Sequence, residues 1–203
     1  MSCALTTPDL DMLTDADLVA LHLGGRKAAF AVLMRRHKQP LYRLIVGQIG
    51  DADEALDLVQ ETFVAAHGAL ARFDAQRSLR AWLSRIAINK CRDLLRRRRV
   101  RHLLTRFTPW QMVDAVRDPA ADAEAQAIGR DSLSQTLAAI AHLPAALREP
   151  LLLCAVEQLS QAEAAEVLGI SVKAVETRVR RARAALAEIR HAVEGTGARP
   201  RMT

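Results

Sequence analysis

The stretch Ser160–Ile189, SQAEAAEVLGISVKAVETRVRRARAALAEI, decides the fold of the C-terminal part of this chain. Its pattern predicts two short helices joined by a tight turn. Ser160 and Glu163 have the spacing of a capping box, in which each side chain bonds the backbone amide of the other residue. Gly169 is placed to end the first helix and Ser171 to cap the second. A short break containing Gly between two such helices is typical of a helix-turn-helix.

The second helix of this stretch has one apolar and one polar side. The predicted apolar stripe consists of Val172, Val175, Val179, Ala182, Leu186 and Ile189. The opposite side carries Lys173, Glu176, Thr177, Arg180, Arg181 and Ala184. Such a helix suits the DNA major groove, where Arg reads guanine, Thr meets a base or its methyl group and Glu accepts from cytosine. The alternative is an ordinary solvated amphipathic helix, and the capped turn favours DNA reading over it.

The composition predicts an all-α protein with an anionic partner. Half of the residues are hydrophobic but only 3% are aromatic, and runs that favour strands are nearly absent. The formal net charge of +6 favours nucleic acid before membrane as the partner. No apolar run reaches the ~18 residues that span a bilayer, and the acidic N-terminus does not resemble a signal peptide. We therefore expect a cytoplasmic protein without membrane insertion.

Charge is segregated along the chain. Residues 1–25 hold four acids and no Lys or Arg, and residues 48–63 hold five acids and no base. Residues 77–106 hold eleven bases against one acid, and residues 107–131 return to a net charge of −3. Such blocks indicate separate faces for separate partners.

Residue types that carry catalysis or metal binding do not cluster in the sequence. Cys3, Cys91 and Cys154 are odd in number and far apart, and no His has metal-ligand spacing to another His or Cys. We therefore expect no disulfide framework, no metal and no cofactor. No Ser/His/Asp set or glycine-rich phosphate loop stands out, which argues against an enzyme.

The N-terminal half predicts a small bundle of four helices. They are expected over 16–23, 26–48 and 51–70, with a fourth that is capped by Ser78 and runs into Arg96, Arg97, Arg98 and Arg99. In the third helix the predicted core positions are Leu56, Val59, Phe63, Ala66 and Leu70. Pro40 should kink the second helix, and Pro150 should kink or delay the helix before the helix-turn-helix.

Three stretches in a fixed order carry a resemblance to a known family. They are DLVQETF (57–63), LRAWLSRIAIN (79–89) with the Arg run after it, and the helix-turn-helix through RAAL (183–186). With these stretches the chain resembles the extracytoplasmic-function (ECF) sigma factors, small members of the sigma-70 family of bacterial transcription initiation factors. The resemblance implies two helical domains joined by a flexible linker. We expect a promoter-melting domain over 12–101, a linker over 102–127, a promoter-reading domain over 128–191 and a disordered tail over 192–203.

The resemblance implies how each surface is used. The helix that matches DLVQE docks on the β′ clamp helices of RNA polymerase in this family, which assigns Asp57, Gln60 and Glu61 to polymerase binding. Spacing alone places Asp57 and Glu61 one turn apart on one face, and a solvated acidic face is the alternative. The family captures a flipped base of the −10 element in the loop before the Trp helix. That loop consists here of Phe73, Asp74, Ala75, Gln76, Arg77 and Ser78.

The remaining assignments concern DNA. Arg80, Arg85, Asn89 and Lys90 match the surface that follows the opened non-template strand. Trp82 has the spacing of a core residue, although it is also able to stack on a base. The Arg96–Arg99 run is expected to hold duplex phosphates, because adjacent residues point all around a helix. Family contacts to the −35 element fall on Glu176, Thr177, Arg180 and Arg181, beside Lys173 on the same side of the helix.

We interpret the chain as an alternative sigma factor without chemistry of its own. Its expected partners are core RNA polymerase, through the β′ clamp helices and the β subunit, promoter DNA in the nucleoid and, by the resemblance, an anti-sigma factor. A helix-turn-helix regulator that binds operators without polymerase is the main alternative. That regulator would need a self-association face or an effector pocket in the N-terminal half, and the acidic helix and the Arg run account for this half better.

Overall fold

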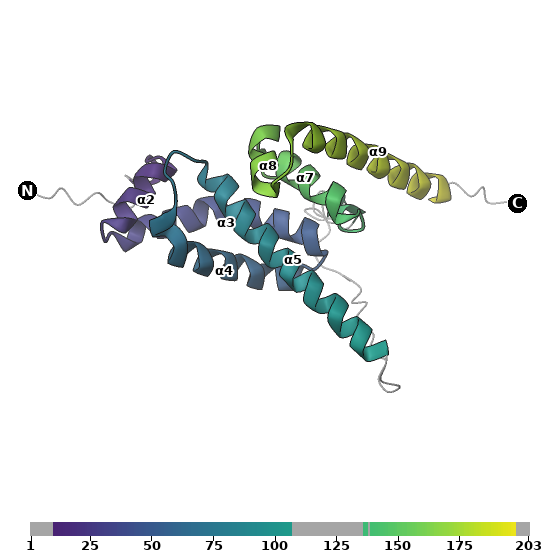
Figure 1. Ribbon diagram of the computed structural model, residues 1–203, viewed down its shortest axis with the longest axis horizontal. Coiled ribbons are helices and arrows are strands. Elements are labelled where there is room, and N and C mark those ends of the chain that lie inside the picture. Colours follow the sequence, from purple (N-terminus) through teal and green to yellow (C-terminus); the bar gives the residue numbers. More distant parts are fainter. Residues whose placement is uncertain (1–9, 107–135, 138, 198–203) are drawn as a thin grey trace, which may run out of the picture.

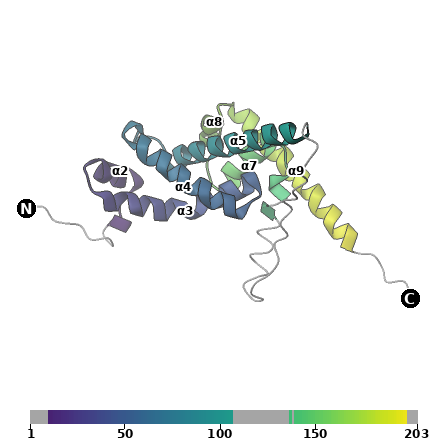
Figure 2. The same ribbon diagram turned by 90° about the horizontal axis from the view of Figure 1, so that it is seen from below.

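The computed structural model describes residues 10–106, 136–137 and 139–197, and its regular elements there are all helices. The N-terminal domain contains α2 (Asp15–Leu23), α3 (Lys27–Ile49), α4 (Ala52–Ala69), the short 3₁₀-helix η1 (Leu70–Arg72) and α5 (Leu79–Arg106). The C-terminal domain contains α7 (Ala145–Ala155), α8 (Gln161–Leu168) and α9 (Val172–Gly197). The C-terminal domain lies along one side of the N-terminal bundle, with α8 near the start of α5 (Figures 1 and 2). The predicted all-α, two-domain fold is confirmed.

Local sequence accounts for where the N-terminal helices begin and end. Thr14 forms a capping box with Asp17 at the start of α2. The Asp51 carboxylate caps α4 by accepting from the Glu54 amide at 2.9 Å. Gly50 ends α3 at φ +74°, in the left-handed region that a residue without Cβ reaches readily. The four predicted helices of this half are therefore present, with bounds close to those expected.

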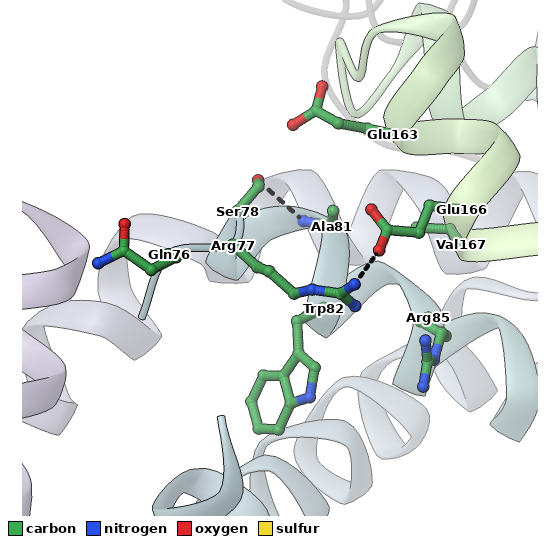
Figure 3. A pocket seen from close by; sticks show the side chains of 9 residues that line it. All are labelled: Gln76, Arg77, Ser78, Ala81, Trp82, Arg85, Glu163, Glu166 and Val167. Carbon is green, nitrogen blue, oxygen red and sulfur yellow. Dashed lines mark hydrogen bonds and ion pairs between the residues drawn. The ribbon is translucent and has the colours of Figure 1, made fainter. Parts of the chain in front are cut away.

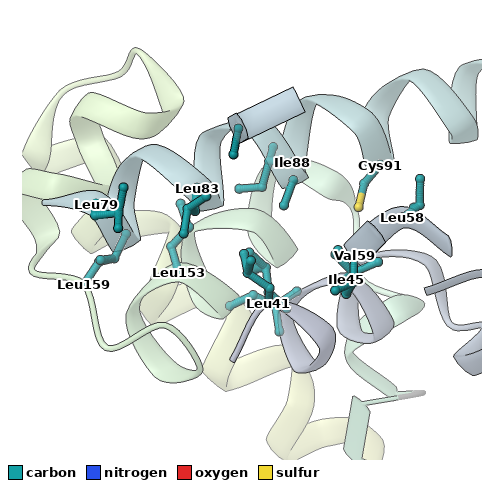
Figure 4. Packing of buried hydrophobic residues seen from close by; sticks show 14 of the residues in the cluster. Leu41, Ile45, Leu58, Val59, Leu79, Leu83, Ile88, Cys91, Leu153 and Leu159 are labelled. Carbon is teal, nitrogen blue, oxygen red and sulfur yellow. The ribbon is translucent and has the colours of Figure 1, made fainter. Parts of the chain in front are cut away.

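The core of the N-terminal domain forms where α3 packs against α2, α4 and α5. Val59, Phe63, Ala66 and Leu70 are buried there, as predicted. Leu56 was predicted to join them, and this prediction is wrong because its side chain is 45% exposed. Its neighbour Leu58 is buried instead, beside Ile45 and Cys91 (Figure 4). Both positions fit an apolar stripe, and the position that becomes buried is the one that the neighbouring helices cover.

Other differences concern the helix ends and the prolines. The α3 helix continues through Pro40, and α7 begins at Ala145 and continues through Pro150, so the delayed start of α7 is not observed. The α5 helix extends to Arg106, past the expected domain end at residue 101. The α9 helix extends to Gly197, so residues 192–197 of the expected disordered tail are helical, and 198–203 lie outside the described residues. None of the helices described is long and apolar enough to cross a membrane.

Candidate nucleic-acid interface

The predicted helix-turn-helix is present in α8 and α9. The Ser160 hydroxyl accepts from the Glu163 amide at 3.2 Å, and the Ser160 amide donates to the Glu163 carboxylate at 2.8 Å. The Ser160 hydroxyl also donates to the Glu163 carboxylate, at 2.7 Å, and the two hydrogen bonds that this carboxylate accepts, from the hydroxyl and from the Ser160 amide, lower the pKa of Glu163. Gly169 ends α8 at φ +68°, and Ser171 caps α9 through a 3.2 Å bond from the Ala174 amide. Local hydrogen bonds thus hold the turn that positions α9.

The outward side of α9 matches the prediction, and its apolar stripe does so only in part. Lys173, Glu176, Arg180, Arg181 and Ala184 are exposed, and Thr177 is half-buried. Val175, Val179 and Ala182 are buried against the rest of the domain. Val172 was placed in the stripe but is 47% exposed, and Ile189 lies at its exposed edge. The rest of the described chain therefore covers these two side chains only in part.

The predicted −10 loop forms a turn between η1 and α5 that is held by its own hydrogen bonds. The Asp74 carboxylate accepts from the Gln76 amide at 3.0 Å, and the Asp74 carbonyl accepts from the Arg77 amide at 2.9 Å. The Ser78 hydroxyl caps α5 by accepting from the Ala81 amide at 3.2 Å. Residues 74–77 are exposed and Phe73 is half-buried. The loop therefore presents its polar side chains outward from a fixed backbone.

Trp82 combines packing with access to a cavity. It is half-buried, and its ring lies 5.1 Å from the ring of Phe73, centroid to centroid. Trp82 also lines a cavity of about 290 Å³ together with the loop, Arg85 and residues of α8 (Figure 3). Trp82 therefore packs against its neighbours, as predicted, and also borders the cavity.

The four residues predicted to follow single-stranded DNA differ in exposure and in their contacts within the chain. Arg85 and Asn89 are exposed on α5. Arg80 is half-buried and donates to the Glu157 carbonyl at 3.2 Å. Lys90 donates to the Glu61 carboxylate at 2.9 Å, which joins a predicted DNA residue to a predicted polymerase residue. Neither contact follows from the sequence pattern, because the partners lie 77 and 29 positions away along the chain.

The Arg96–Arg99 run points around α5, as adjacent residues on a helix must. Arg97 and Arg99 are exposed. Arg96 pairs with Asp93 at 2.9 Å, and Arg98 pairs with the Glu54 carboxylate on α4. Two of the four guanidinium groups therefore already have carboxylate partners within the chain, so Arg97 and Arg99 are better placed for an external phosphate.

The predicted docking residues share one exposed face of α4. Asp57, Gln60 and Glu61 are exposed and line a shallow groove with Val64, Ala65 and Lys90. Val64 is 73% exposed, an apolar side chain within an otherwise polar face. Val64 was not among the predicted docking residues, although its position one turn after Gln60 and Glu61 places it on their face.

Comparisons with known proteins agree with this arrangement. Residues 33–101 match the family Sigma-70 region 2, and residues 133–186 match Sigma-70 region 4. The chain is 40% identical over 180 residues to RNA polymerase sigma factor CnrH of Cupriavidus metallidurans, covering 86% of this chain and 94% of CnrH. It is 32% identical over 177 residues to ECF RNA polymerase sigma factor SigM of Mycobacterium tuberculosis, covering 87% of this chain and 84% of SigM. A solved structure of CnrH with the cytosolic domain of CnrY superposes with a TM-score of 0.66 at 36% identity, covering 88% of this chain and 97% of that chain.

Proposed function

Because the chain belongs to the sigma-70 family of bacterial RNA polymerase sigma factors, we propose that it acts as an alternative sigma factor of the ECF group. It binds core RNA polymerase and directs promoter-specific transcription initiation by reading −35 and −10 elements. The observation that carries the proposal is the separation of an exposed acidic face on α4 from basic faces on α5 and α9. One chain thereby offers distinct surfaces to a protein partner and to DNA.

We assign polymerase docking to Asp57, Gln60 and Glu61 on α4, with Val64 as an apolar contact one turn further along the same face. Carboxylates orient the partner protein and select partners with a complementary charge. An exposed apolar side chain adds binding free energy when the partner removes it from water. The partner surface is the β′ clamp helices, with further contacts to the β subunit.

We assign DNA recognition to two surfaces. The 73–78 loop and Arg80, Arg85, Asn89 and Lys90 take the −10 element. The Arg96–Arg99 run, chiefly through Arg97 and Arg99, holds the phosphates upstream of the opened bases. The outward side of α9 takes the −35 element through Lys173, Glu176, Thr177, Arg180 and Arg181. The corresponding domains are 12–101 and 128–191, joined by 102–127.

Three further assignments follow from this function. The chain has no catalytic centre of its own, since nucleotide addition belongs to the polymerase. Its place of action is the cytoplasm, at the nucleoid, where polymerase and promoters are. An anti-sigma factor is a further partner, because the relative CnrH has been solved in complex with another protein domain.

The test is transcription in vitro with purified core polymerase and genomic promoter fragments. Transcripts with defined starts that depend on the chain support the proposal. Asp57→Ala with Glu61→Ala should weaken co-purification with core polymerase by about tenfold or more, since each contact of this kind contributes on the order of 1 kcal/mol. Glu188→Ala, which removes an exposed acid from α9 and leaves α4 unchanged, is the control.

Association of the double variant with core polymerase at wild-type affinity would contradict the docking assignment. Absence of transcripts and of core binding, together with tight binding to a duplex, would identify an operator-binding regulator instead.

A further inference from the structure

The groove assigned to polymerase docking is formed by two helices. Five of its lining residues come from α4, and Lys90 comes from α5. The Lys90 ammonium donates to the Glu61 carboxylate at 2.9 Å, which joins the two helices at the groove. A positive charge is therefore part of a surface whose other charged groups, Asp57 and Glu61, are acidic.

Lys90 lies on a different side of α5 from its neighbours Arg85 and Asn89. These two residues are both exposed, and because they are four positions apart they share one face of the helix. Lys90 is five positions after Arg85, which turns it about 140° away around the helix axis. Its side chain is 27% exposed and borders the buried positions Ala87 and Cys91. This position directs Lys90 towards α4.

The ion pair contributes little to the stability of the free chain. The side chain of Glu61 is 60% exposed and that of Lys90 is 27% exposed, so water screens the two charges. A partner that covers the groove removes this water, and a carboxylate that is covered without a cation is strongly unfavourable. The pair therefore matters more for binding than for folding.

The two acids of the groove differ in what they already contact. Lys90 binds one oxygen of the Glu61 carboxylate, Oε2, which fixes the direction of the other oxygen. Asp57 is exposed one turn earlier on α4, and no cation within the described residues pairs with it. Asp57 is thus open to a cation of the partner, whereas Glu61 is held in place and already neutralised.

We propose that Lys90 is a positioning residue for polymerase docking, which holds the Glu61 carboxylate in the groove and compensates its charge when the partner covers it. This role adds to the DNA contact assigned to Lys90, and it rests on the proposed docking function of α4. The helix of core polymerase that fits this groove presents a cation to Asp57 and an apolar side chain to Val64.

The affinity of full-length variants for purified cognate core polymerase tests the proposal, measured by competition against fluorescently labelled wild-type chain. Lys90→Met removes the charge and keeps an apolar stem. It should weaken binding about threefold or more, because Glu61 is then covered without its cation. The melting temperature should not change, since the pair is screened in the free chain.

Two further variants separate the ion pair from net charge. Lys90→Arg keeps a cation that is able to donate to Glu61, so its affinity should stay within about twofold of the wild type. Arg183→Ala removes an exposed positive charge from α9, away from the groove, and is the control.

A double-mutant cycle with Glu61 distinguishes positioning from an independent contact. Lys90 acts through Glu61 in our proposal, so Lys90→Met should have little effect once Glu61 has been replaced by Gln. The double variant should then bind about as well as Glu61→Gln alone. Two separate contacts would instead give losses that multiply.

Wild-type affinity of Lys90→Met overturns the proposal, and so do losses that multiply in the double variant. A loss of affinity that is accompanied by a lower melting temperature overturns it as well, because it indicates a role in folding.

Asp57→Ala separates this inference from the proposed function. Weaker binding of Asp57→Ala with unchanged binding of Lys90→Met would leave the docking assignment standing and remove this inference alone. Unchanged binding of both variants would remove the docking assignment together with the inference.

Discussion

Replacing Glu157 by Gln tests the domain contact at its most buried carboxylate. The Glu157 side chain is 1% exposed at the end of α7. Burial raises the pKa of the carboxyl to about 6, while the charges of Arg80 on α5 and His37 on α3 and the Ser84 hydroxyl act in the opposite direction. His37 is itself buried and hydrogen-bonds the Asp15 carboxylate at 2.8 Å. The packed state therefore favours the protonated, neutral form of Glu157.

The sign and size of the effect follow from this pKa. The ordinary value for the carboxyl is 4.5, so the stabilising contribution of protonation is complete below pH 4.5 and is lost as the pH rises through 6. At pH 7 the charged carboxylate makes the packed state about 2 kcal/mol less stable than a neutral side chain of the same shape would. At pH 5, where most of the packed molecules carry the proton, the same difference is about 0.8 kcal/mol.

Glu157→Gln should therefore stabilise the protein, and more so at pH 7 than at pH 5. The amide stays neutral at both pH values, and it brings an N–H donor close to the Ser84 hydroxyl. The assay is urea unfolding followed by circular dichroism, with the free energy of unfolding of variant and wild type compared at each pH. Their difference should grow by about 1 kcal/mol from pH 5 to pH 7.

Glu188→Gln on the exposed side of α9 changes the same charge and should show no such growth. A difference for Glu157→Gln that stays constant between pH 5 and pH 7 would refute the reasoning. It would mean that the carboxyl ionises in the packed state as it does in the unfolded chain.

Two further predictions concern the C-terminal domain. Arg180→Ala with Arg181→Ala should reduce transcription from a −35-dependent promoter by about tenfold or more and leave core polymerase binding unchanged, since each Arg–base contact contributes about 1–3 kcal/mol. Arg183→Ala, exposed but beside the apolar stripe, is the control, and equal transcription from the double variant would remove the −35 assignment. Ser160→Ala should lower the free energy of unfolding by about 1 kcal/mol at pH 7, because the capping box is lost. Thermal unfolding measures this loss, and an unchanged melting temperature would show that the cap contributes nothing.

The pKa of Glu163 bears on the same cap. The hydrogen bonds from Ser160 lower this pKa, so the contribution of the capping carboxylate is present at neutral pH and is lost as the pH falls through the lowered value. The destabilising effect of Ser160→Ala should accordingly shrink in acid.

The helices and the recognition face could be predicted from sequence because their causes are local. A capping box needs only Ser160 and Glu163, three positions apart, and the end of α8 needs only a Gly at 169. The outward position of Arg180 follows from the 3.6-residue period of α9. The family resemblance rested on contiguous stretches of the same kind.

Tertiary structure decided what covers each of those surfaces. Leu56 and Val172 satisfy the apolar period and are nevertheless exposed, because burial depends on which helix lies opposite. Arg77 and Arg80 were predicted to face DNA, and each is engaged by a group of the C-terminal domain that no periodicity connects to it.

The packing of the two domains is the part that only the tertiary structure decided. It depends on Gly47 lying against Leu152 and on Arg92 meeting Glu149, pairs far apart in the chain. Within a helix, hydrogen bonds and caps join residues three or four positions apart, so the sequence alone determines these contacts. A contact between domains depends on the shapes and charges of two finished surfaces, which exist only once both domains have folded.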